Sequence, residues 1–472
     1  MAERDLDLAA LFHEVAGRAA AFRGAIGDGP QRPLRDYREM VEVFAEKTPE
    51  TGLAAEAVIA DLMDKAAAGL HATTGPRFFG WVIGASHPVG VAADWLTSAW
   101  GQNAGNHQAA PAAAAAESVA ASWLLDLLGL PADCSVGFVT GATVANLVCL
   151  AAARSAVLQR AGWDVETDGL FGAPPIHVVI GDDAHTTVFA ALQVLGLGHD
   201  RVIRVPTDEM GRVTVEGFTA AISGCDGPTI AVLQAGQLNT GAFDPFAELI
   251  ALAHARGAWV HVDGAFGLWA RACPSLAGLA EGAEQADSWA TDGHKWLQTP
   301  YDSGYAIVRD ARAHRKAMTA SASYLPETAE GERDPSHFVP ELSRRARGFA
   351  TWAMIRHLGR EGIVEMVERH CRLARQMADG LRNEAGIAIL NEVFLNQVLV
   401  RFGADRPVEE ADALTRAVIA RMQADGTCFA GGARWRGQWV MRISIIGWAT
   451  TAQDIGASVA AIRAAWRACS NP

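Results

Sequence analysis

The chain has 472 residues, enough for two or three domains with a substantial core. Half of the residues are hydrophobic and a fifth are charged, which is the balance of an ordinary globular protein. The 40 basic and 53 acidic residues give a net charge of −13, which argues against binding to nucleic acid or to an anionic membrane surface. A small anionic ligand is not excluded, because phosphate binding is decided by local groups.

The N-terminus and the cysteines bear on location. Residues 1–5 are charged and lack the apolar run of a signal peptide, and no apolar stretch is long and uninterrupted enough to span a bilayer. The seven cysteines are scattered and include no CxxC pair, so they indicate neither a disulfide framework nor a metal site. We therefore expect a reduced, cytoplasmic location, no metal and no membrane or nucleic-acid partner.

Residues 1–75 are predicted to form a helical arm. Apolar residues recur near helical spacing at 6–15 and 37–44, and glycines and prolines at 27–33 interrupt the pattern. Such an arm has little to pack on by itself. We expect it to lie across a second subunit, and a flap on its own domain is the alternative.

A glycine-rich aromatic segment follows at residues 75–82. This segment is either plain core or the lining of a pocket or interface. Rigid aromatic side chains without helical periodicity favour the pocket or interface. The aromatic residues predicted to line a substrate pocket are Phe78, Phe79, Trp81 and Trp100.

Residues 76–350 alternate between short apolar runs and amphipathic stretches, which is typical of an α/β domain. Strands are predicted at 136–139, 176–180, 202–205, 229–233, 259–262 and 305–308. Helices are predicted at 88–100, 109–127, 146–159, 187–196, 215–223 and 246–256. This order predicts a mostly parallel central sheet flanked by helices, with ligands at the carboxyl edge of the strands.

Residues 351–472 are predicted to form a small C-terminal α+β domain. A long helix from 351 to about 381 leads into it. Its strands are predicted at 397–402 and 439–445, and its helices at 409–424 and 453–468.

Lys295 and Asp263 are the first chemical candidates. Lys295 follows the short apolar run at 286–290 and precedes Trp296, a setting in which desolvation favours the neutral, nucleophilic amine of an imine-forming lysine. Asp263 ends a buried strand about thirty residues earlier. Alone, each has a more common explanation, as a surface pair or as a turn residue. Together they match pyridoxal phosphate, whose aldehyde needs a lysine and whose ring nitrogen needs an acid.

Residues 137–146 read as a strand, a turn of small residues and a helix. Backbone N–H groups at the start of that helix, with the hydroxyls of Thr140 and Thr143, would form a phosphate site. The turn is not a Walker loop, because no GK[ST] follows.

His185 and the loop at 237–245 follow further strands at the same edge. His185 is either a helix cap or a flat ring that stacks on the cofactor and passes a proton near the reacting carbon. The loop caps the helix that begins near Pro245. In addition, Asn239 or Thr240 could contact the cofactor or the substrate.

These motifs resemble the group II pyridoxal-phosphate-dependent decarboxylases of fold type I, the family of aromatic amino acid, histidine, tyrosine and glutamate decarboxylases. The resemblance extends from about 78 to 352, and weakly to Arg442. It is carried by TGATVAN at 140–146, DDAHTT at 182–187, the loop at 237–245, HVDGAFG at 261–267, DGHKWL at 292–297 and PYDSG at 300–304.

The resemblance implies a homodimer with shared active sites that decarboxylates an L-amino acid, with an aromatic or bulky side chain favoured by the aromatic residues above. Lys295 would bind the coenzyme aldehyde, Asp263 the pyridine nitrogen, and His185 one ring face. The remaining cofactor contacts would come from Ala265 beneath the ring and, at the phosphate, from Thr140, Gly141, Ala142, Thr143 and His294.

Two departures from the family pattern matter. Asp292 stands where the family has Asn; an acid there would repel phosphate unless turned away, so it is assigned no phosphate role. Residues 334–338 lack the tyrosine that protonates the product carbon, so either His337 replaces it or the step is altered. The alternatives are a decarboxylating aldehyde synthase, a retro-aldol lyase, an aminotransferase or a non-catalytic PLP-binding protein. Arg434, Arg436 and Arg442 are each a carboxylate clamp or a surface residue.

Overall fold

The computed structural model describes residues 7–319 and 332–470. The chain divides into two compact units. The first joins residues up to Ile83 with Gln376–Leu390 and the residues from Leu399; the second comprises Gly84–Arg375 and Asn391–Val398. The three parts predicted from the sequence do not coincide with these units, because the N-terminal helices group with the C-terminal segments.

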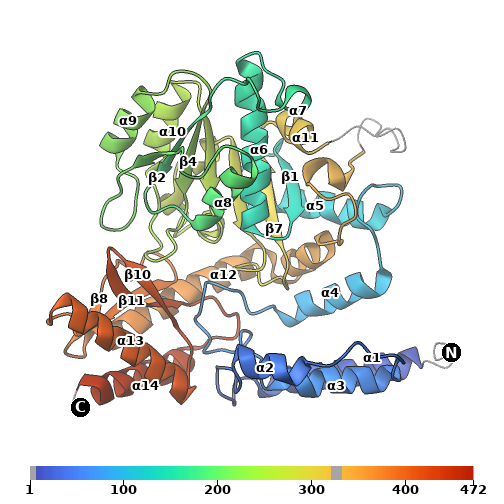
Figure 1. Cartoon of the computed structure of the whole chain (residues 1–472), viewed down its shortest axis with the longest axis vertical. Helices are drawn as coiled ribbons and strands as arrows, with labels where there is room; N and C mark the ends of the chain where they lie inside the picture. The colour runs from blue at the N-terminus through green and yellow to red at the C-terminus, as the bar shows by residue number, and fades with distance from the viewer. Residues whose placement is uncertain (1–6, 320–331, 471–472) are drawn as a thin grey trace. The chain divides into compact units, whose positions relative to one another are not determined.

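The larger unit contains a seven-stranded sheet with the order β1-β7-β6-β5-β4-β2-β3 (Figure 1). Only β7 runs antiparallel to its neighbours, so the prediction of a mostly parallel sheet is confirmed. The strands are β1 Ser135–Val139, β2 His177–Gly181, β3 Ile203–Val205, β4 Thr229–Gln234, β5 Trp259–Asp263, β6 Ser288–Asp292 and β7 Gly304–Val308.

Helices cover both faces of this sheet, as a parallel sheet of continuous apolar strands requires. The helices are α4 Pro88–Trp100, α5 Pro111–Leu127, α6 Ala142–Arg160, α7 Val165–Asp168, α8 Thr186–Val194, α9 Val215–Ser223, α10 Phe246–His254, α11 Ala311–Met318 and α12 Gly348–Arg382. The 3-10 turns are η1 Gly267–Ala272, η2 Ala277–Ala280, η3 Ala283–Gln285 and η4 Pro335–Phe338. Gly359, with φ of 60°, kinks α12, which the sequence predicted as unbroken.

Helix α6 is the central helix of this unit. Its apolar residues pack with those of β1, β2, β4 and β5 into one core. Among the described residues it is the one helix whose length and composition would allow it to cross a membrane, contrary to the expectation of none, and 67% of it is buried inside the protein. Such burial is what the core helix of a parallel sheet shows.

The C-terminal part of the first unit has a four-stranded sheet of order β10-β11-β9-β8. Its strands are β8 Ile387–Ile389, β9 Gln397–Phe402, β10 Gly431–Trp435 and β11 Gln438–Ser444, and its helices are α13 Val408–Asp425 and α14 Ala452–Ser470. The sequence predicted β9 and β11 and missed β8 and β10. β8 has three residues and β10 begins with two glycines, so neither shows a strand pattern.

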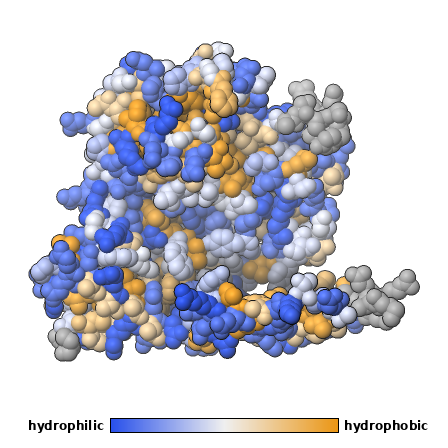
Figure 2. Space-filling view, in the orientation of Figure 1, coloured by the Kyte–Doolittle hydropathy of each residue, from blue (hydrophilic) through white to orange (hydrophobic). Residues whose placement is uncertain are grey.

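Three helices make up the N-terminal arm: α1 Leu8–Ala25, α2 Tyr37–Phe44 and α3 Ala55–Ala67. None of their residues is buried. Figure 2 shows apolar side chains among the polar ones on the surface of these helices.

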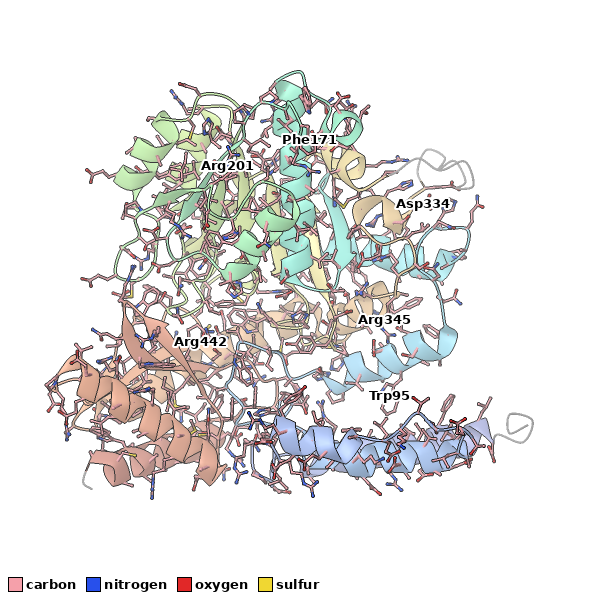
Figure 3. All side chains as sticks on the ribbon, in the orientation of Figure 1. Trp95, Phe171, Arg201, Asp334, Arg345 and Arg442 are labelled. Carbon is pink, nitrogen blue, oxygen red and sulfur yellow. The ribbon has the colours of Figure 1, made fainter. Side chains whose placement is uncertain are left out.

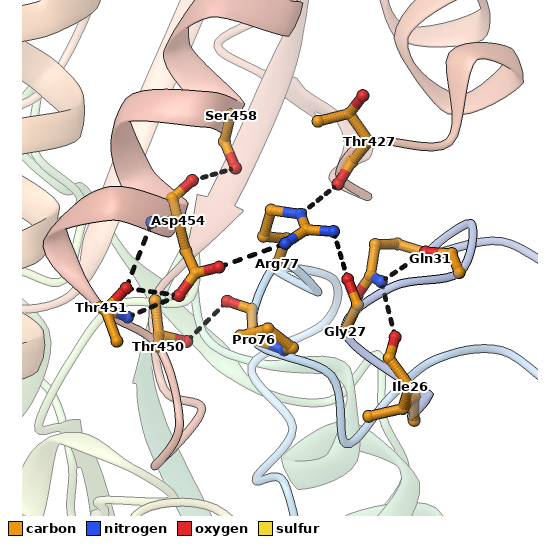
Figure 4. A network of polar contacts seen from close by, with 11 residues as sticks. Ile26, Gly27, Gln31, Pro76, Arg77, Thr427, Thr450, Thr451, Asp454 and Ser458 are labelled. Atoms are coloured by element: carbon orange, nitrogen blue, oxygen red, sulfur yellow. Dashed lines mark hydrogen bonds and ion pairs between the residues drawn. The ribbon is translucent and has the colours of Figure 1, made fainter. Parts of the chain in front are cut away.

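Arg77 connects the arm to the C-terminal segments within the first unit (Figure 4). Its guanidinium donates to the carbonyl oxygens of Gly27 at 2.6 Å and Thr427 at 2.7 Å. It also forms an ion pair of 3.2 Å with Asp454 of α14. The interruption of the helical pattern near Gly27 is therefore a turn, and the Gly27 carbonyl oxygen in this turn accepts a hydrogen bond from Arg77.

Candidate active site

Five polar segments lie at the carboxyl edge of the large sheet, as predicted. Four of them follow β1, β2, β4 and β6 and contain Thr140, His185, Asn239 and Lys295 respectively; the fifth begins with Asp263, the last residue of β5. β5 and β6 are paired neighbours, with Asp263 opposite Ala290. This pairing sets the acid beside the strand that leads to the lysine.

Asp263 is 4% exposed and lies at the centre of the site. Its Oδ1 accepts a hydrogen bond from the Ala265 N–H at 3.2 Å, and its Oδ2 accepts from Asn146 Nδ2 at 3.3 Å. Burial raises the pKa of Asp263, and the nearby His185 and Lys295 oppose that shift. The structure links Asp263 to His185 through Asn146 and Thr187, and it places Lys295 after the neighbouring strand β6.

The Lys295 amine has both an aromatic and an anionic neighbour. Its Nζ lies 6.0 Å from the ring centre of Phe266 and 2.9 Å from Asp292 Oδ2. The aromatic part of the predicted setting is present. The purely apolar setting is not, because the carboxylate of Asp292 is 2% exposed and faces the amine.

The turn before α6 has the features of a phosphate site. Helix α6 begins at Ala142, and the hydroxyls of Thr140 and Thr143 have no hydrogen-bond partner among the described residues. A Cβ on Gly141 would lie 2.9 Å from His294 Cε1, and a Cβ on Gly304 would lie 2.5 Å from Gly141 Cα. The small residues therefore permit close approach, and the free hydroxyls and the helix N-terminus fit a phosphate group.

His294 borders the same turn. Its ring stacks on Tyr301 at 4.3 Å between ring centres, and its Nδ1 accepts from the Ser303 N–H at 3.3 Å. Burial lowers the pKa of His294, while Asp292 opposes this shift. A phosphate contact of His294 stays a prediction.

Asp292, to which the sequence assigned no phosphate role, is not turned away from this site. Its Oδ1 accepts the Ala142 N–H at 2.6 Å, at the start of α6. A helix N-terminus favours an anion because its first N–H groups carry partial positive charge. Asp292 thus supplies an internal anion where the sequence predicted the phosphate to bind.

His185 is the N-cap of α8. Its Nδ1 accepts from the Thr187 N–H at 3.3 Å and lies 2.8 Å from Thr187 Oγ1. Because Nδ1 is an acceptor, the neutral ring carries its proton on Nε2. The cap explanation therefore holds, and stacking on the cofactor stays a prediction.

The loop after β4 is held by its own side chains. Gln237 Oε1 accepts from the N–H groups of Asn239 at 2.6 Å and Thr240 at 3.0 Å. The Thr240 hydroxyl donates to the Met210 carbonyl at 2.6 Å. Asn239 Oδ1, by contrast, is buried and has no partner among the described residues. Of the two residues proposed from this loop, Asn239 is the one left able to bind a ligand.

The aromatic residues predicted to line the pocket differ in exposure. Phe78 and Phe79, 3% and 1% exposed, are core side chains of the first unit. Phe78 stacks on Phe429 at 5.0 Å. For Phe78 and Phe79 the structure therefore agrees with the alternative that this segment is part of the core. Trp81 and Trp100 are each 51% exposed, so a pocket role remains open for them.

His337 lies near the start of the segment that follows residue 331. Its Nε2 is 3.9 Å from Asp334 Oδ2, and burial together with Arg315 lowers its pKa. Asp334, labelled in Figure 3, is also 2.7 Å from His107 Nδ1. Within the described ranges, the contacts of His337 do not include Lys295 or Asp263, and a catalytic role for it stays a prediction.

The three candidate arginines are in the first unit. Arg434 donates to the Gly437 carbonyl at 3.1 Å, and Arg436 lies 4.8 Å over the Trp435 ring. Burial lowers the pKa of Arg442, which is labelled in Figure 3, to about 10. Its guanidinium has no polar partner in the part of the chain that the structure describes. Arg442 is therefore the one best suited to bind a carboxylate.

Two residues of the site were given no role from the sequence. Asn146 and His261 are both completely buried, and His261 Nε2 lies 2.8 Å from Asn146 Oδ1. The sequence did contain a clue to each of them: Asn146 is a polar residue in an apolar helix, and His261 is a polar residue in an apolar strand. Asn146 ends the motif TGATVAN, and His261 begins the motif HVDGAFG. Because buried polar groups need hydrogen-bond partners, a contact between two such residues could have been suspected.

Comparison with known proteins agrees with this geometry. Residues 38–403 match the model of the pyridoxal-dependent decarboxylase conserved domain. An aromatic-L-amino-acid decarboxylase from Bacillus atrophaeus is 31% identical over 316 residues, which cover 64% of this chain and 62% of that protein. Tryptophan decarboxylase 1 from Oryza sativa subsp. japonica is 28% identical over 416 residues, 82% of this chain and 79% of that protein.

Solved structures share the fold. The Oryza sativa TDC structure with PLP and tryptamine has a TM-score of 0.92 at 22% identity and covers 100% of both chains. The mouse CSAD structure has a TM-score of 0.90 at 20% identity, with 98% of this chain and 99% of that chain covered. The coenzyme is pyridoxal 5′-phosphate, and the chain belongs to the pyridoxal-phosphate-dependent amino acid decarboxylases of group II.

Proposed function

We propose that this protein decarboxylates an aromatic L-amino acid. The observation that carries the reaction is the placement of Asp263, at the end of β5, and Lys295, after the paired strand β6, at one edge of the sheet. The aromatic preference is supported by the similarity to the Bacillus and Oryza decarboxylases. A relative named L-2,4-diaminobutyrate decarboxylase, 30% identical over 341 residues, supports the competing choice of a cationic substrate.

The residues have distinct tasks in this proposal. When bound, pyridoxal phosphate supplies a pyridinium ring that accepts the electron pair left by departing CO₂. Lys295 binds the aldehyde carbon, and the Asp263 carboxylate accepts a hydrogen bond from the ring nitrogen. Thr140, Thr143 and the start of α6 bind the phosphate.

A substrate panel tests this proposal. Release of CO₂ is measured from tryptophan, tyrosine, phenylalanine, 2,4-diaminobutyrate, glutamate and histidine at equal concentrations. The highest kcat/KM is expected for an aromatic amino acid. A preference for diaminobutyrate or glutamate would overturn the aromatic assignment while leaving decarboxylation intact.

An aldehyde product is the second candidate. Residues 334–338 contain no tyrosine, and a 4-hydroxyphenylacetaldehyde synthase from Rhodiola rosea is 24% identical over 400 residues. If the substrate Cα is not protonated after CO₂ is lost, O₂ can oxidise this carbon, with aldehyde, ammonia and hydrogen peroxide as products. Amine with no peroxide supports simple decarboxylation; peroxide equal to the CO₂ released supports the synthase.

We further propose that the active enzyme is a homodimer with shared active sites. The arm helices α1, α2 and α3 bury none of their residues, yet Phe12 of α1 is 60% exposed and Tyr37 of α2 is 82% exposed. A second copy of the chain would cover such apolar side chains.

A further inference from the structure

A chain of buried hydrogen bonds connects Trp259 to Asp263. Trp259 Nε1 lies 2.9 Å from Ser288 Oγ, which lies 3.0 Å from His261 Nδ1. His261 Nε2 lies 2.8 Å from Asn146 Oδ1, and Asn146 Nδ2 lies 3.3 Å from Asp263 Oδ2. All five side chains are buried.

The direction of each hydrogen bond in this chain is fixed. The indole N–H of Trp259 can only donate. Burial lowers the pKa of His261 to about 3, so its ring is neutral at physiological pH, with one donor and one acceptor nitrogen. The Asn146 carbonyl can only accept, so His261 Nε2 carries the proton and Nδ1 accepts from the Ser288 hydroxyl. Every donor therefore points toward Asp263.

Asn146 is a branch point. Its second amide N–H donates to Thr187 Oγ1 at 3.3 Å. The Thr187 hydroxyl is then free to donate to His185 Nδ1, 2.8 Å away. One amide thus contacts the acid directly and reaches the histidine through a single hydroxyl.

We propose that Asn146 is a positioning residue, which fixes the Asp263 carboxylate and the His185 ring relative to each other so that both meet the coenzyme ring in one geometry. His261 and Ser288 orient the amide and prevent it from flipping. A flipped amide would direct two acceptor oxygens, Asn146 Oδ1 and Asp263 Oδ2, at each other and leave His261 Nε2–H without an acceptor.

The electrostatic effect has the same direction. Burial of a carboxylate without donors is costly, and the pKa of Asp263 is raised by burial. A donated N–H favours the ionised form that a protonated pyridine requires as its partner. Asn146 therefore favours both the position and the charge of Asp263.

Three variants test this role. Asn146→Asp keeps the size of the side chain and replaces two N–H donors with acceptors. Thr187→Val removes only the branch to His185. Ser155→Ala is the matched control, because Ser155 is a buried polar residue on the same helix and donates to Glu166 at 3.1 Å, away from the network.

The readouts are the dissociation constant of pyridoxal phosphate and the visible circular dichroism of the bound coenzyme, which reports how the ring is held. For Asn146→Asp we expect affinity to fall by about tenfold or more, the effect of losing one hydrogen bond to a charged group, and the visible dichroism to change. Thr187→Val should change the dichroism with a smaller loss of affinity, and Ser155→Ala should change neither.

Wild-type affinity and dichroism in Asn146→Asp would overturn the proposal. Should that variant fail to fold, an unchanged dichroism in Thr187→Val would overturn the link to His185. The measurements concern coenzyme binding alone, so their outcome is independent of which amino acid is the substrate.

Discussion

Asp292 contacts two groups that are predicted to bind the coenzyme. One carboxylate oxygen accepts the first N–H of α6 at 2.6 Å and the other lies 2.9 Å from the Lys295 amine. A bound phosphate would approach the same helix N-terminus, and two anions at one site repel each other. We therefore expect the Asp292 carboxylate to weaken the binding of phosphate at this turn.

Replacement of Asp292 by asparagine tests this effect. We expect Asp292→Asn to bind inorganic phosphate about tenfold more tightly, because the helix N–H groups remain and a negative charge is lost. The affinity is measured by competition with pyridoxal phosphate. Asp182→Asn is the control, since Asp182 is an exposed carboxylate that follows β2 at the same edge of the sheet. Weaker phosphate binding in Asp292→Asn would mean that the acid helps to bind the phosphate.

Buried histidines connect several elements of the large unit. His314 of α11 lies 2.8 Å from Ser135 Oγ of β1 and 3.0 Å from the Phe338 carbonyl of η4. Burial lowers the pKa of His314 to about 3, as it does for His261. In the unfolded chain a histidine binds its proton near pH 6.5. The stability that neutral His314 contributes is therefore present above about pH 6.5 and is lost as the pH falls toward 3.

Because burial lowers the pKa of these histidines, the folded protein should lose stability in acid. Between pH 7 and pH 5 each such histidine should lower the free energy of unfolding by about 2 kcal/mol. Burial raises the pKa of Asp244 to about 7, which has the opposite sign in this range, so a difference between variants is needed. In urea unfolding at both pH values, His314→Gln should lose about 2 kcal/mol less than the wild type.

The control for acid sensitivity is His13→Gln, a change at an exposed histidine of α1. It should show the wild-type pH dependence. An equal loss of stability in His314→Gln and the wild type would contradict the burial argument.

Element positions were predictable where periodicity was strong. The ranges for α4 and α9 agree with the sequence prediction, because Pro88 marks the start of the first and Thr214 caps the second. The sequence could place Lys295 and Asp263 at the carboxyl edge of the sheet, because Asp263 ends one predicted strand and Lys295 follows another apolar run. The contact of Asp292 with Ala142, and the network through Asn146, join residues 150 and 117 positions apart. Only the fold determines which of those side chains meet.

At the scale of the whole molecule, the exposed arm predicts association. Leu8 and Phe12 lie four residues apart on one face of α1 and are 57% and 60% exposed. The double variant Leu8→Glu, Phe12→Glu places two negative charges on this face of α1. It should convert a dimer to a monomer, as measured by sedimentation. The change His13→Glu, at an exposed neighbour on the same helix, should leave the dimer intact. Sedimentation of the double variant as a dimer would exclude α1 from the interface.

The role of Lys295 as the coenzyme lysine is tested most directly by chemical trapping. The holoenzyme is reduced with borohydride, which makes the bond between coenzyme and amine permanent, and the peptides are then mapped by mass spectrometry. We predict one pyridoxyl group per chain, attached to Lys295. A label on another lysine, or no label on protein that contains the coenzyme and releases CO₂, would contradict this assignment.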